Sequence, residues 1–335
     1  MKRRKKITTL LLITFIFLEL TITAHAKTQN TIIVDKNGNG DYTTIQSAID
    51  NAHQGSTILV KKGTYPEILN IQKQLTLLGE DKTETYINPI SKENKYAVRL
   101  GAPEAVLEGF TVSNGAPGLY SNAIRITSTG VKIANCNIID TPVGIAVFTS
   151  DNAIENCVFK GCKDEGIALL GSQYTECDNN QILNCIFYEN CDGIELQYSS
   201  NNKISNCEIY DNTHTGIDAI SQSNDKNTIS NCKIYKNKVH GIYLSASSDN
   251  QILDCELSEN NNGNVKINGD SENNIIEPEP KEDNKIIQNN KITQNIKSIN
   301  VEPNKKEEEK SFLTRFLEYL SKLIIPQTMP FYVFL

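Results

Sequence analysis

The chain has 335 residues, of which 39% are hydrophobic and 22% charged, and its formal net charge at pH 7 is −7. Residues 1–26 contain five of the 33 basic residues and one of the 40 acidic residues, so the remainder has a formal charge of −11. A balance this acidic argues against nucleic acid or an anionic membrane as the partner of the mature chain.

The first 26 residues have the pattern of a secretory signal peptide. A basic head at 2–6 precedes an apolar run over 7–18 and the small-residue sequence Ala24-His25-Ala26. We therefore expect an exported protein that begins near Lys27 and acts outside the cell, at the cell surface or in the periplasm.

Residues 31–80 predict strands with one helix between the first two. Thr31–Val34 and Thr57–Val60 are rich in β-branched residues and end at turn signals. Four apolar residues between them share one helical face: Ile45, Ala48, Ile49 and Ala52. An amphipathic helix in this place covers the open apolar end and the unpaired edge of a solenoid.

From Gly130 to Asn295 the chain repeats a kernel of the form Ile-x-Asn-Cys-x-Ile. Six cysteines mark the repeats at spacings of 21, 28, 22, 25 and 23 residues: Cys136, Cys157, Cys185, Cys207, Cys232 and Cys255. A period near 22 indicates a solenoid. The Ile before the cysteine, the Ile after it and a Gly-Ile-x-Leu piece predict three short strands per turn.

Columns of Asn indicate the corners of the turns. The residue before each of these cysteines is Asn or Asp, and Asn tolerates the left-handed backbone that a corner needs. Two more Asn columns lie five residues before and five residues after the cysteines. Three strands and Asn-lined corners predict a parallel β-helix over 27–295, in which each coil buries its apolar face against the next.

Two families resemble parts of this chain. Gly40–Ile49, Gly63–Tyr65 and Leu75–Gly79 resemble the opening of pectin methylesterases and other pectate-lyase-like right-handed β-helix proteins. The Asn-rich coils resemble NosD-type and other carbohydrate-binding and sugar-hydrolase (CASH) repeats of exported proteins. The resemblance implies a right-handed β-helix and a carbohydrate ligand. The chain has no Trp, so it lacks the Gly-Arg-Pro-Trp segment of the esterases.

The cysteines allow two interpretations. Nine cysteines in an exported chain would ordinarily indicate disulfides. Six occupy one inward repeat position, however, where a small apolar thiol stacks on its copy in the next coil. Cys162, Cys177 and Cys191 lie outside that column and are better candidates for a bridge. Copper binding by the column is a weaker alternative, because the chain has no Met-rich segment.

The outward positions of the Gly-Ile-x-Leu strands, together with the corners beside them, hold the candidate catalytic residues. Neighbouring carboxylates repel, so one acquires a raised pKa or the pair shares a cation such as Ca²⁺. We predict four catalytic candidates: Asp192, Glu195, Asp218 and His240. We predict three metal ligands at the adjoining corners: Asp164, Glu165 and His214. The alternative for each residue is a solvated acidic face.

Part of this group resembles the active site of alginate C5-epimerases. Gly216-Ile217-Asp218 resembles their Tyr-Gly-Phe-Asp-Pro-His motif, and Val239-His240-Gly241-Ile242 resembles their Arg-His-Gly-Phe segment. Thr215 and Ile220 replace the Tyr and the second His of the motif. The resemblance implies a uronate epimerase. A polysaccharide lyase, a glycoside hydrolase and a protein without catalysis remain open.

Tyrosines form a second candidate binding surface. Tyr188, Tyr210 and Tyr235 each lie three residues after a column cysteine, and Tyr243 follows Ile242 on a third strand. Tyrosine rings can stack on sugar rings and donate hydrogen bonds to them. The alternative is that these rings only pack along an exposed sheet.

The chain after the repeats predicts a charged linker at 296–310 and an amphipathic helix with an apolar tail at 311–335. Arg315, Glu318 and Lys322 interrupt the apolar stripe, so this helix is not a membrane span. We expect it to cover the end of the solenoid or to contact a membrane surface or a partner.

The sequence thus predicts an all-β, right-handed β-helix that recognises extracellular acidic polysaccharide and, if it is an enzyme, processes it. One alternative is a non-catalytic structural or adhesive surface protein. Another is a NosD-like periplasmic accessory protein for copper, which would have to bind copper tightly.

Overall fold

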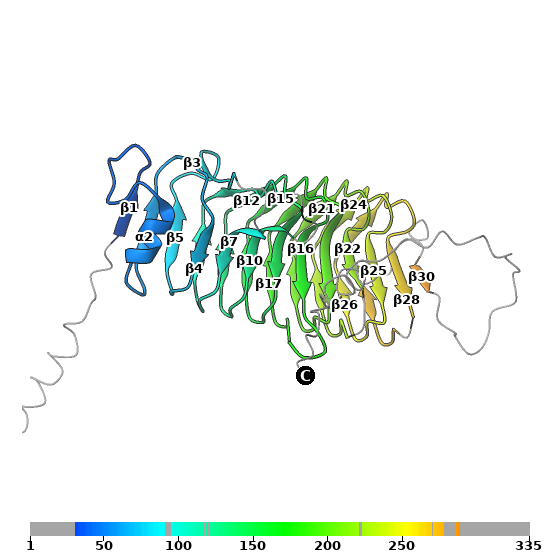
Figure 1. The fold of residues 1–335 in the computed structure, drawn as a ribbon. Helices are drawn as coiled ribbons and strands as arrows, with labels where there is room; N and C mark the ends of the chain where they lie inside the picture. Colours follow the sequence, from blue (N-terminus) through cyan, green and yellow to red (C-terminus); the bar gives the residue numbers. More distant parts are fainter. Residues whose placement is uncertain are drawn as a thin grey trace, which may run out of the picture.

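The computed structural model describes residues 31–90, 95–116, 118, 121–220, 223–269 and 271–277, and the backbone of 286–288. The predicted signal peptide, charged linker and C-terminal helix lie outside the described residues. Within them, three parallel sheets wind into one elongated solenoid (Figure 1). No helix among the described residues is long and apolar enough to cross a membrane.

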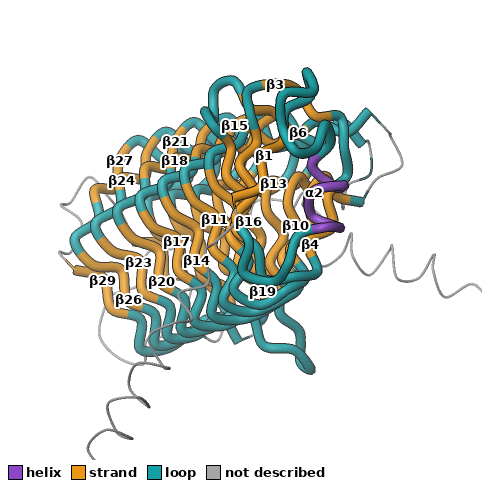
Figure 2. The backbone as a smooth tube through the Cα atoms, turned by 90° about the vertical axis from the view of Figure 1, so that its left-hand side faces the viewer, coloured by secondary structure: helices purple, strands orange, loops and turns teal. Residues whose placement is uncertain are grey.

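Each coil contributes one strand to each sheet, and the strands stack in chain order (Figure 2). Sheet A contains β1 (Thr31–Val34), β2 (Thr57–Val60), β5 (Thr76–Gly79), β8 (Val106–Glu108), β11 (Lys132–Ala134), β14 (Ala153–Glu155), β17 (Gln181–Leu183), β20 (Lys203–Ser205), β23 (Thr228–Ser230), β26 (Gln251–Leu253) and β29 (Ile275–Glu277). Sheet B contains β3 (Gly63–Tyr65), β6 (Thr85–Ile87), β9 (Thr111–Val112), β12 (Asn137–Ile139), β15 (Val158–Lys160), β18 (Ile186–Tyr188), β21 (Glu208–Tyr210), β24 (Lys233–Tyr235) and β27 (Glu256–Ser258). Sheet C contains β4 (Leu69–Ile71), β7 (Tyr96–Leu100), β10 (Asn122–Ile126), β13 (Val143–Val147), β16 (Glu165–Leu170), β19 (Asp192–Gln197), β22 (Ile217–Ala219), β25 (Ile242–Ser245), β28 (Val265–Asn268) and β30 (Ile286–Gln288).

The repeat positions stack in register, which confirms the three predicted strands per turn. Ile182 pairs with Ile204 in sheet A, Phe187 with Ile209 in sheet B, and Ile194 with Ile217 in sheet C. These side chains point inward and form one continuous core along the described solenoid. Each coil therefore depends on its neighbours to bury its apolar face.

The Asn columns serve two different purposes. The residue before each column cysteine is left-handed, with φ between 50° and 55° from Asn135 to Asp254, as predicted. The columns five residues away instead form buried amide ladders. In one of them, Asn190 donates from its backbone N–H and its Nδ2 to Oδ1 of Asn212, at 3.1 and 3.0 Å. Asn212 repeats both bonds to Asn237. These amides satisfy buried polar groups at a corner that has no strand pairing.

Helix α2 (Ile45–Asn51) lies at the N-terminal end of the solenoid, beside the edge strand β4 (Figure 1). The Gln46 side chain accepts a hydrogen bond from the backbone N–H of Asn70 in β4, at 2.8 Å. Glu67 accepts the N–H groups of Ile45 and Gln46, and Lys73 donates to three carbonyls at the other helix end. The helix thus covers part of an otherwise unpaired sheet edge, and its two ends bind charges of the favourable sign.

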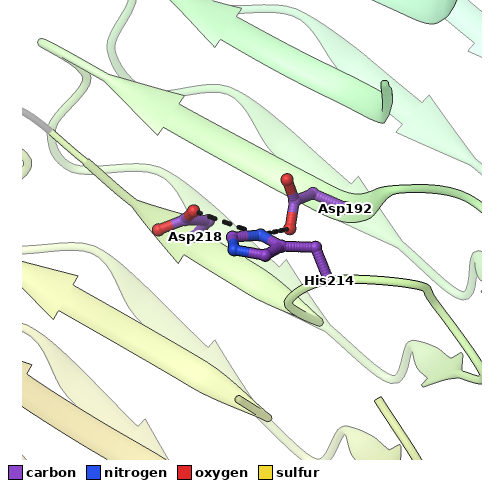
Figure 3. Close-up of side chains that lie close together, drawn as sticks. All are labelled: Asp192, His214 and Asp218. Carbon is purple, nitrogen blue, oxygen red and sulfur yellow. Dashed lines mark hydrogen bonds and ion pairs between the residues drawn. The ribbon is translucent and has the colours of Figure 1, made fainter. Parts of the chain in front are cut away.

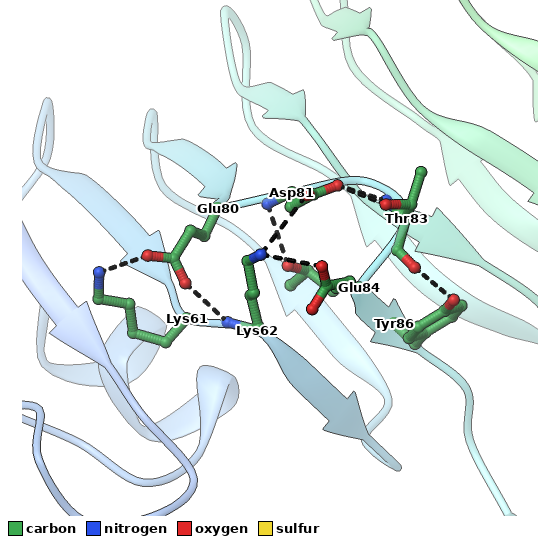
Figure 4. A network of polar contacts seen from close by, with 8 residues as sticks. Lys61, Lys62, Glu80, Asp81, Thr83, Glu84 and Tyr86 are labelled. Carbon is green, nitrogen blue, oxygen red and sulfur yellow. Dashed lines mark hydrogen bonds and ion pairs between the residues drawn. The ribbon is translucent and has the colours of Figure 1, made fainter.

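Ion pairs on the surface join the coils next to this helix (Figure 4). Lys61 binds Glu80 at 2.6 Å, and Lys62 binds Glu84 at 2.9 Å and Asp81 at 3.6 Å. Their side chains are about a third or more exposed, so each pair adds at most about 1 kcal/mol of stability.

No disulfide joins any of the nine cysteines, all of which lie in the described residues. The prediction that Cys162, Cys177 and Cys191 were candidates for a bridge is therefore wrong. Cys162 occupies the ladder position before Asn190, whose Oδ1 accepts its backbone N–H at 3.0 Å. The Cys177 thiol lies 3.4 Å from the carbonyl oxygen of Val147, and burial raises its pKa to about 12. These thiols fill corners in which other coils place polar side chains.

Candidate functional site

One outward column of sheet C carries a sequence of distinct chemistries along the solenoid. The paired residues in this column, in order, are Asn70, Arg99, Arg125, Ala146, Ala168, Glu195, Asp218, Tyr243 and Lys266. The predicted neighbours Glu195 and Asp218 therefore lie side by side on β19 and β22. Two small residues separate these acids from two arginines.

A glycine at the start of β19 places Asp192 and Glu195 on the same face. A Cβ on Gly193 would lie 2.5 Å from the carbonyl oxygen of Gly216 and 2.7 Å from Ile209 in the core. The backbone therefore approaches the core closely at this glycine, and the two acids that flank the Gly193–Ile194 pair are both buried, at 5% exposure for Asp192 and 2% for Glu195. The corner position before the glycine is occupied on neighbouring coils by Glu165 and Asp192, which are in register.

Asp192, His214 and Asp218 form the tightest cluster on this face (Figure 3). Nδ1 of His214 lies 2.7 Å from Oδ1 of Asp192 and 3.9 Å from Oδ2 of Asp218. Oδ1 of Asp192 also accepts the backbone N–H of Thr215 at 2.7 Å. The short bond to Asp192 places the imidazole proton on Nδ1, so that Nε2 is the basic nitrogen of the ring.

Three carboxyl groups here are buried without full hydrogen bonding. Among the described residues, Oε1 of Glu195 and Oδ1 of Asp218 have no hydrogen-bond partner, and the Glu165 carboxyl can hydrogen-bond only with the neighbouring carboxyl of Glu195. Burial raises the pKa of each of these groups well above its usual value, and neighbouring carboxylates raise it further. His214 acts in the opposite direction on the pKa of Asp218. The acidic face is therefore not the solvated surface that the alternative interpretation required.

His240 lies one coil beyond this cluster and stacks on Tyr243, with ring centroids 5.7 Å apart. Burial, with smaller contributions from the charges of Lys266 and His214, lowers its pKa to about 4. His240 is thus neutral at pH 7. No hydrogen bond or ion pair among the described residues joins it to Asp192 or Asp218.

The same cluster could hold a divalent cation. One ligand atom from each of Asp192, His214 and Asp218 lies within 4.8 Å of the others. Asp164 and Glu165, which the sequence suggested as partners of His214, are not part of this set. A mixed nitrogen and oxygen set suits zinc or manganese better than Ca²⁺, which prefers oxygen ligands.

The tyrosine column is a stack of rings. Tyr188 and Tyr210 lie with centroids 5.3 Å apart and planes within 2°, and Tyr210 and Tyr235 with centroids 5.1 Å apart. The ring faces between coils are thus occupied by one another, and Lys160 and Lys233 lie over the two end rings. Sugar binding by this column stays a prediction that would have to use the ring edges.

Two arginines on this face were missed in the sequence. Arg99 and Arg125 precede the first cysteine kernel, which is where the repeat was first recognised. The segment Ala123-Ile124-Arg125-Ile126 has the alternation of a Gly-Ile-x-Leu strand and pairs with β13. Extending the repeat toward the N-terminus would have placed Arg125 in the same column as Glu195.

Known proteins share this architecture. Residues 122–279 match the family described as "Right handed beta helix region". "Probable pectinesterase 67" of Arabidopsis thaliana is 30% identical over 139 residues, which are 39% of this chain and 34% of that protein. The match therefore spans about a third of the pectinesterase.

Two solved structures are similar in fold. The A-module of mannuronan C-5 epimerase AlgE4 from Azotobacter vinelandii has a TM-score of 0.51 and 20% identity, over 67% of this chain and 76% of that one. The enzymatically active domain of tailspike protein 2 from bacteriophage CBA120 has a TM-score of 0.54 and 12% identity, over 69% and 40%. The three wound sheets make the described chain an all-β parallel solenoid, and the family match and the pectinesterase similarity support a pectate-lyase-like right-handed β-helix.

Proposed function

We propose that the protein binds an acidic polysaccharide outside the cell, on the outer face of sheet C, and processes it by proton transfer at Asp192, His214 and Asp218. The observation that carries this proposal is the buried carboxyl cluster beside an imidazole that Asp192 orients. An unpaired buried polar group lowers the stability of a folded protein by about 1–3 kcal/mol. Several such groups in one place therefore indicate a functional site.

The arrangement divides the roles of acid and base. His214 has the most exposed side chain of the cluster, at 31% against 8% for Asp192 and 7% for Asp218. Its Nε2 can act as the proton acceptor, because the carboxylate of Asp192 holds the proton on Nδ1. Asp218 and Glu195, whose pKa values are raised, can be protonated and can donate. Asp192 holds and orients the imidazole.

This division favours removal of a proton from a sugar carbon. A retaining glycoside hydrolase needs an ionised carboxylate as nucleophile beside a carboxylic acid. Asp192 is engaged by His214 and Thr215, and the other two carboxyls have raised pKa values. A uronate lyase or epimerase instead needs a base that removes the carbon-bound proton and an acid that donates a proton in the second half of the reaction. His214 can serve as this base, and Asp218 or Glu195 as this acid.

The comparisons support the class of ligand. The relatives named above include a pectinesterase, a mannuronan epimerase and an enzymatically active tailspike domain. A carbohydrate as the ligand of this chain fits those names.

The test uses residues 27–335 with a panel of uronate and neutral polysaccharides in heavy water, with and without divalent cations, and mass spectrometry of the products. We expect carbon-bound deuterium for epimerisation, or shortened unsaturated chains for elimination, with a uronate polymer only. His214→Gln and Asp218→Asn should lower the rate by about 10²-fold or more. The matched controls His53→Gln and Asp151→Asn change exposed residues and should retain it.

An unchanged panel would refute the catalytic part of the proposal. Binding without turnover would then favour an adhesive or recognition protein. Tight copper binding without any glycan binding would instead favour the copper accessory alternative.

A further inference from the structure

The spacing of Asp192, His214 and Asp218 is close to that of a transition-metal site. Nδ1 of His214 lies 2.7 Å from Oδ1 of Asp192 and 3.9 Å from Oδ2 of Asp218 (Figure 3). Zinc binds nitrogen and oxygen atoms at about 2.0–2.2 Å, so two ligand atoms of a tetrahedral zinc site lie about 3.3 Å apart. The two observed distances bracket this value. A movement of the imidazole by about 0.6 Å away from Asp192 would open the space that the ion needs.

The fold holds these ligands in place and leaves a path to them. Asp192 and Asp218 lie on the paired strands β19 and β22, and Oδ1 of Asp192 accepts the backbone N–H of Thr215 at 2.7 Å. In the corner before β22, the backbone N–H of His214 donates to the carbonyl oxygen of Cys191 at 2.8 Å. The His214 side chain is partly exposed, so an ion can reach the site from solvent along the imidazole.

A buried oxygen without a partner belongs to this group. Oδ1 of Asp218 has no hydrogen-bond partner among the described residues, although its side chain is only 7% exposed. Oε1 of Glu195, in register with Asp218, is buried in the same way. No described Lys or Arg forms an ion pair with either carboxyl. A cation at this place would give a buried oxygen the partner that the described chain does not supply.

The donor atoms distinguish between cations. Ca²⁺ takes about six to eight oxygen ligands, more than two aspartates provide, and it does not favour an imidazole nitrogen. Zinc accepts three protein ligands of this mixed kind and completes its shell with water. The Cys191 thiol, one residue before Asp192, lies outside the set of potential ligands that come together among the described residues. The site therefore fits zinc better than a soft ion that requires thiolates.

We propose that Asp192, His214 and Asp218 form an inhibitory site for zinc, in which the ion binds Nδ1 of His214. The ion takes the place of the proton that Nδ1 now shares with Asp192. A neutral imidazole that binds a metal through Nδ1 carries its single proton on Nε2, so this proton moves from one ring nitrogen to the other. Nε2 then has no lone pair for a substrate proton. The inhibition rests on the proposed function, whereas binding of the ion does not.

The first experiment adds Zn²⁺ to the metal-free full chain, with its thiols kept reduced, and measures binding by calorimetry. We expect one ion per chain, which a large excess of Ca²⁺ does not displace. His214→Gln and Asp218→Asn should each weaken binding at least about tenfold. The matched control His53→Gln removes an exposed histidine outside the site and should leave binding unchanged. Circular dichroism of each variant shows whether a loss comes from misfolding.

A second measurement needs no variant. Co²⁺ bound in place of zinc should give the visible absorption of a nitrogen and oxygen site, without the near-ultraviolet charge-transfer band of a thiolate ligand. That band, or zinc binding that both substitutions leave unchanged, would place the ion at cysteines or elsewhere and would overturn the proposal. Absence of zinc binding to the parent chain would overturn it as well.

The heavy-water assay with a uronate polymer tests the inhibition. Saturating Zn²⁺ should stop turnover, and a chelator should restore it. Zinc that binds at these three residues and leaves turnover unchanged would refute the inhibitory role. A chain that binds zinc there but acts on no glycan would keep the metal site, while both the catalytic proposal and the inhibitory role fail.

Discussion

Glu195→Gln should make the protein more stable at neutral pH. The Glu195 side chain is only 2% exposed, its Oε1 has no partner among the described residues, and Glu165 and Asp218 lie beside it. Glutamine has the same shape as the protonated acid and carries no charge. The substitution removes the cost of keeping Glu195 protonated in the folded protein, and each unit by which burial raises its pKa corresponds to about 1.4 kcal/mol. We therefore expect a gain of about 1 kcal/mol or more at pH 7.5.

The sign of the pH dependence follows from the raised pKa. Below the ordinary value of 4.5 both the folded and the unfolded protein hold the proton, so the variant gains little. As the pH rises above 4.5, the unfolded state releases its proton while the folded state retains it, and the native protein loses stability. The advantage of Glu195→Gln should grow across this range and level off above the folded pKa.

Urea unfolding at pH 4, 6 and 7.5 measures this difference. Glu256→Gln is the matched control, because it removes an exposed carboxylate from sheet B and should change stability by less than about 0.5 kcal/mol. If Glu195→Gln is equally stable or less stable than the parent at pH 7.5, burial of this carboxyl does not destabilise the folded protein.

Three further results follow from the fold. Asn212→Ala should lower the free energy of unfolding by about 2–4 kcal/mol, because it leaves ladder groups of Asn190 and Asn237 unpaired. Asn262→Ala, at an exposed position, should have little effect in the same urea titration. A thiol reductant should leave the urea midpoint unchanged, and a lowered midpoint would reveal a disulfide that contradicts the structure. Gln46→Ala should lower the urea midpoint, because it removes the hydrogen bond to the backbone N–H of Asn70 at the edge strand β4. An unchanged midpoint would show that water replaces this bond at no cost in stability.

The fold was predictable because its determinants are local and repeated. Three features recur in each coil: the left-handed Asn before the column cysteine, the inward Ile positions and the Gly-Ile-x-Leu strand. A wrong assignment of strands or corners at one coil can therefore be recognised by comparison with the other coils. The exact role of the outer Asn columns was not predictable in this way. Each role is fixed by the position within the coil, but Asn occupies all of these positions, so the residue type alone does not distinguish a left-handed backbone from an amide ladder.

The site was only partly predictable because it does not repeat. Parity placed Glu195 beside Asp218 correctly. The contact of His214 with Asp192 could not be read from spacing, because His214 lies in a corner and reaches the preceding coil by its side-chain rotamer. Arg125 was missed for a different reason, since the kernel that defined the repeat starts after it.

The most direct test of the account is to map where an acidic glycan binds. Hydrogen exchange of the protein with and without a hexauronate, read by mass spectrometry of peptides, compares the three sheets in one experiment. We predict protection at 190–197 and 213–219, which carry the Asp192, His214 and Asp218 cluster, with none at the tyrosine strands β18, β21 and β24. Protection confined to the tyrosine strands, or none with any uronate, would contradict the assignment of the site to sheet C.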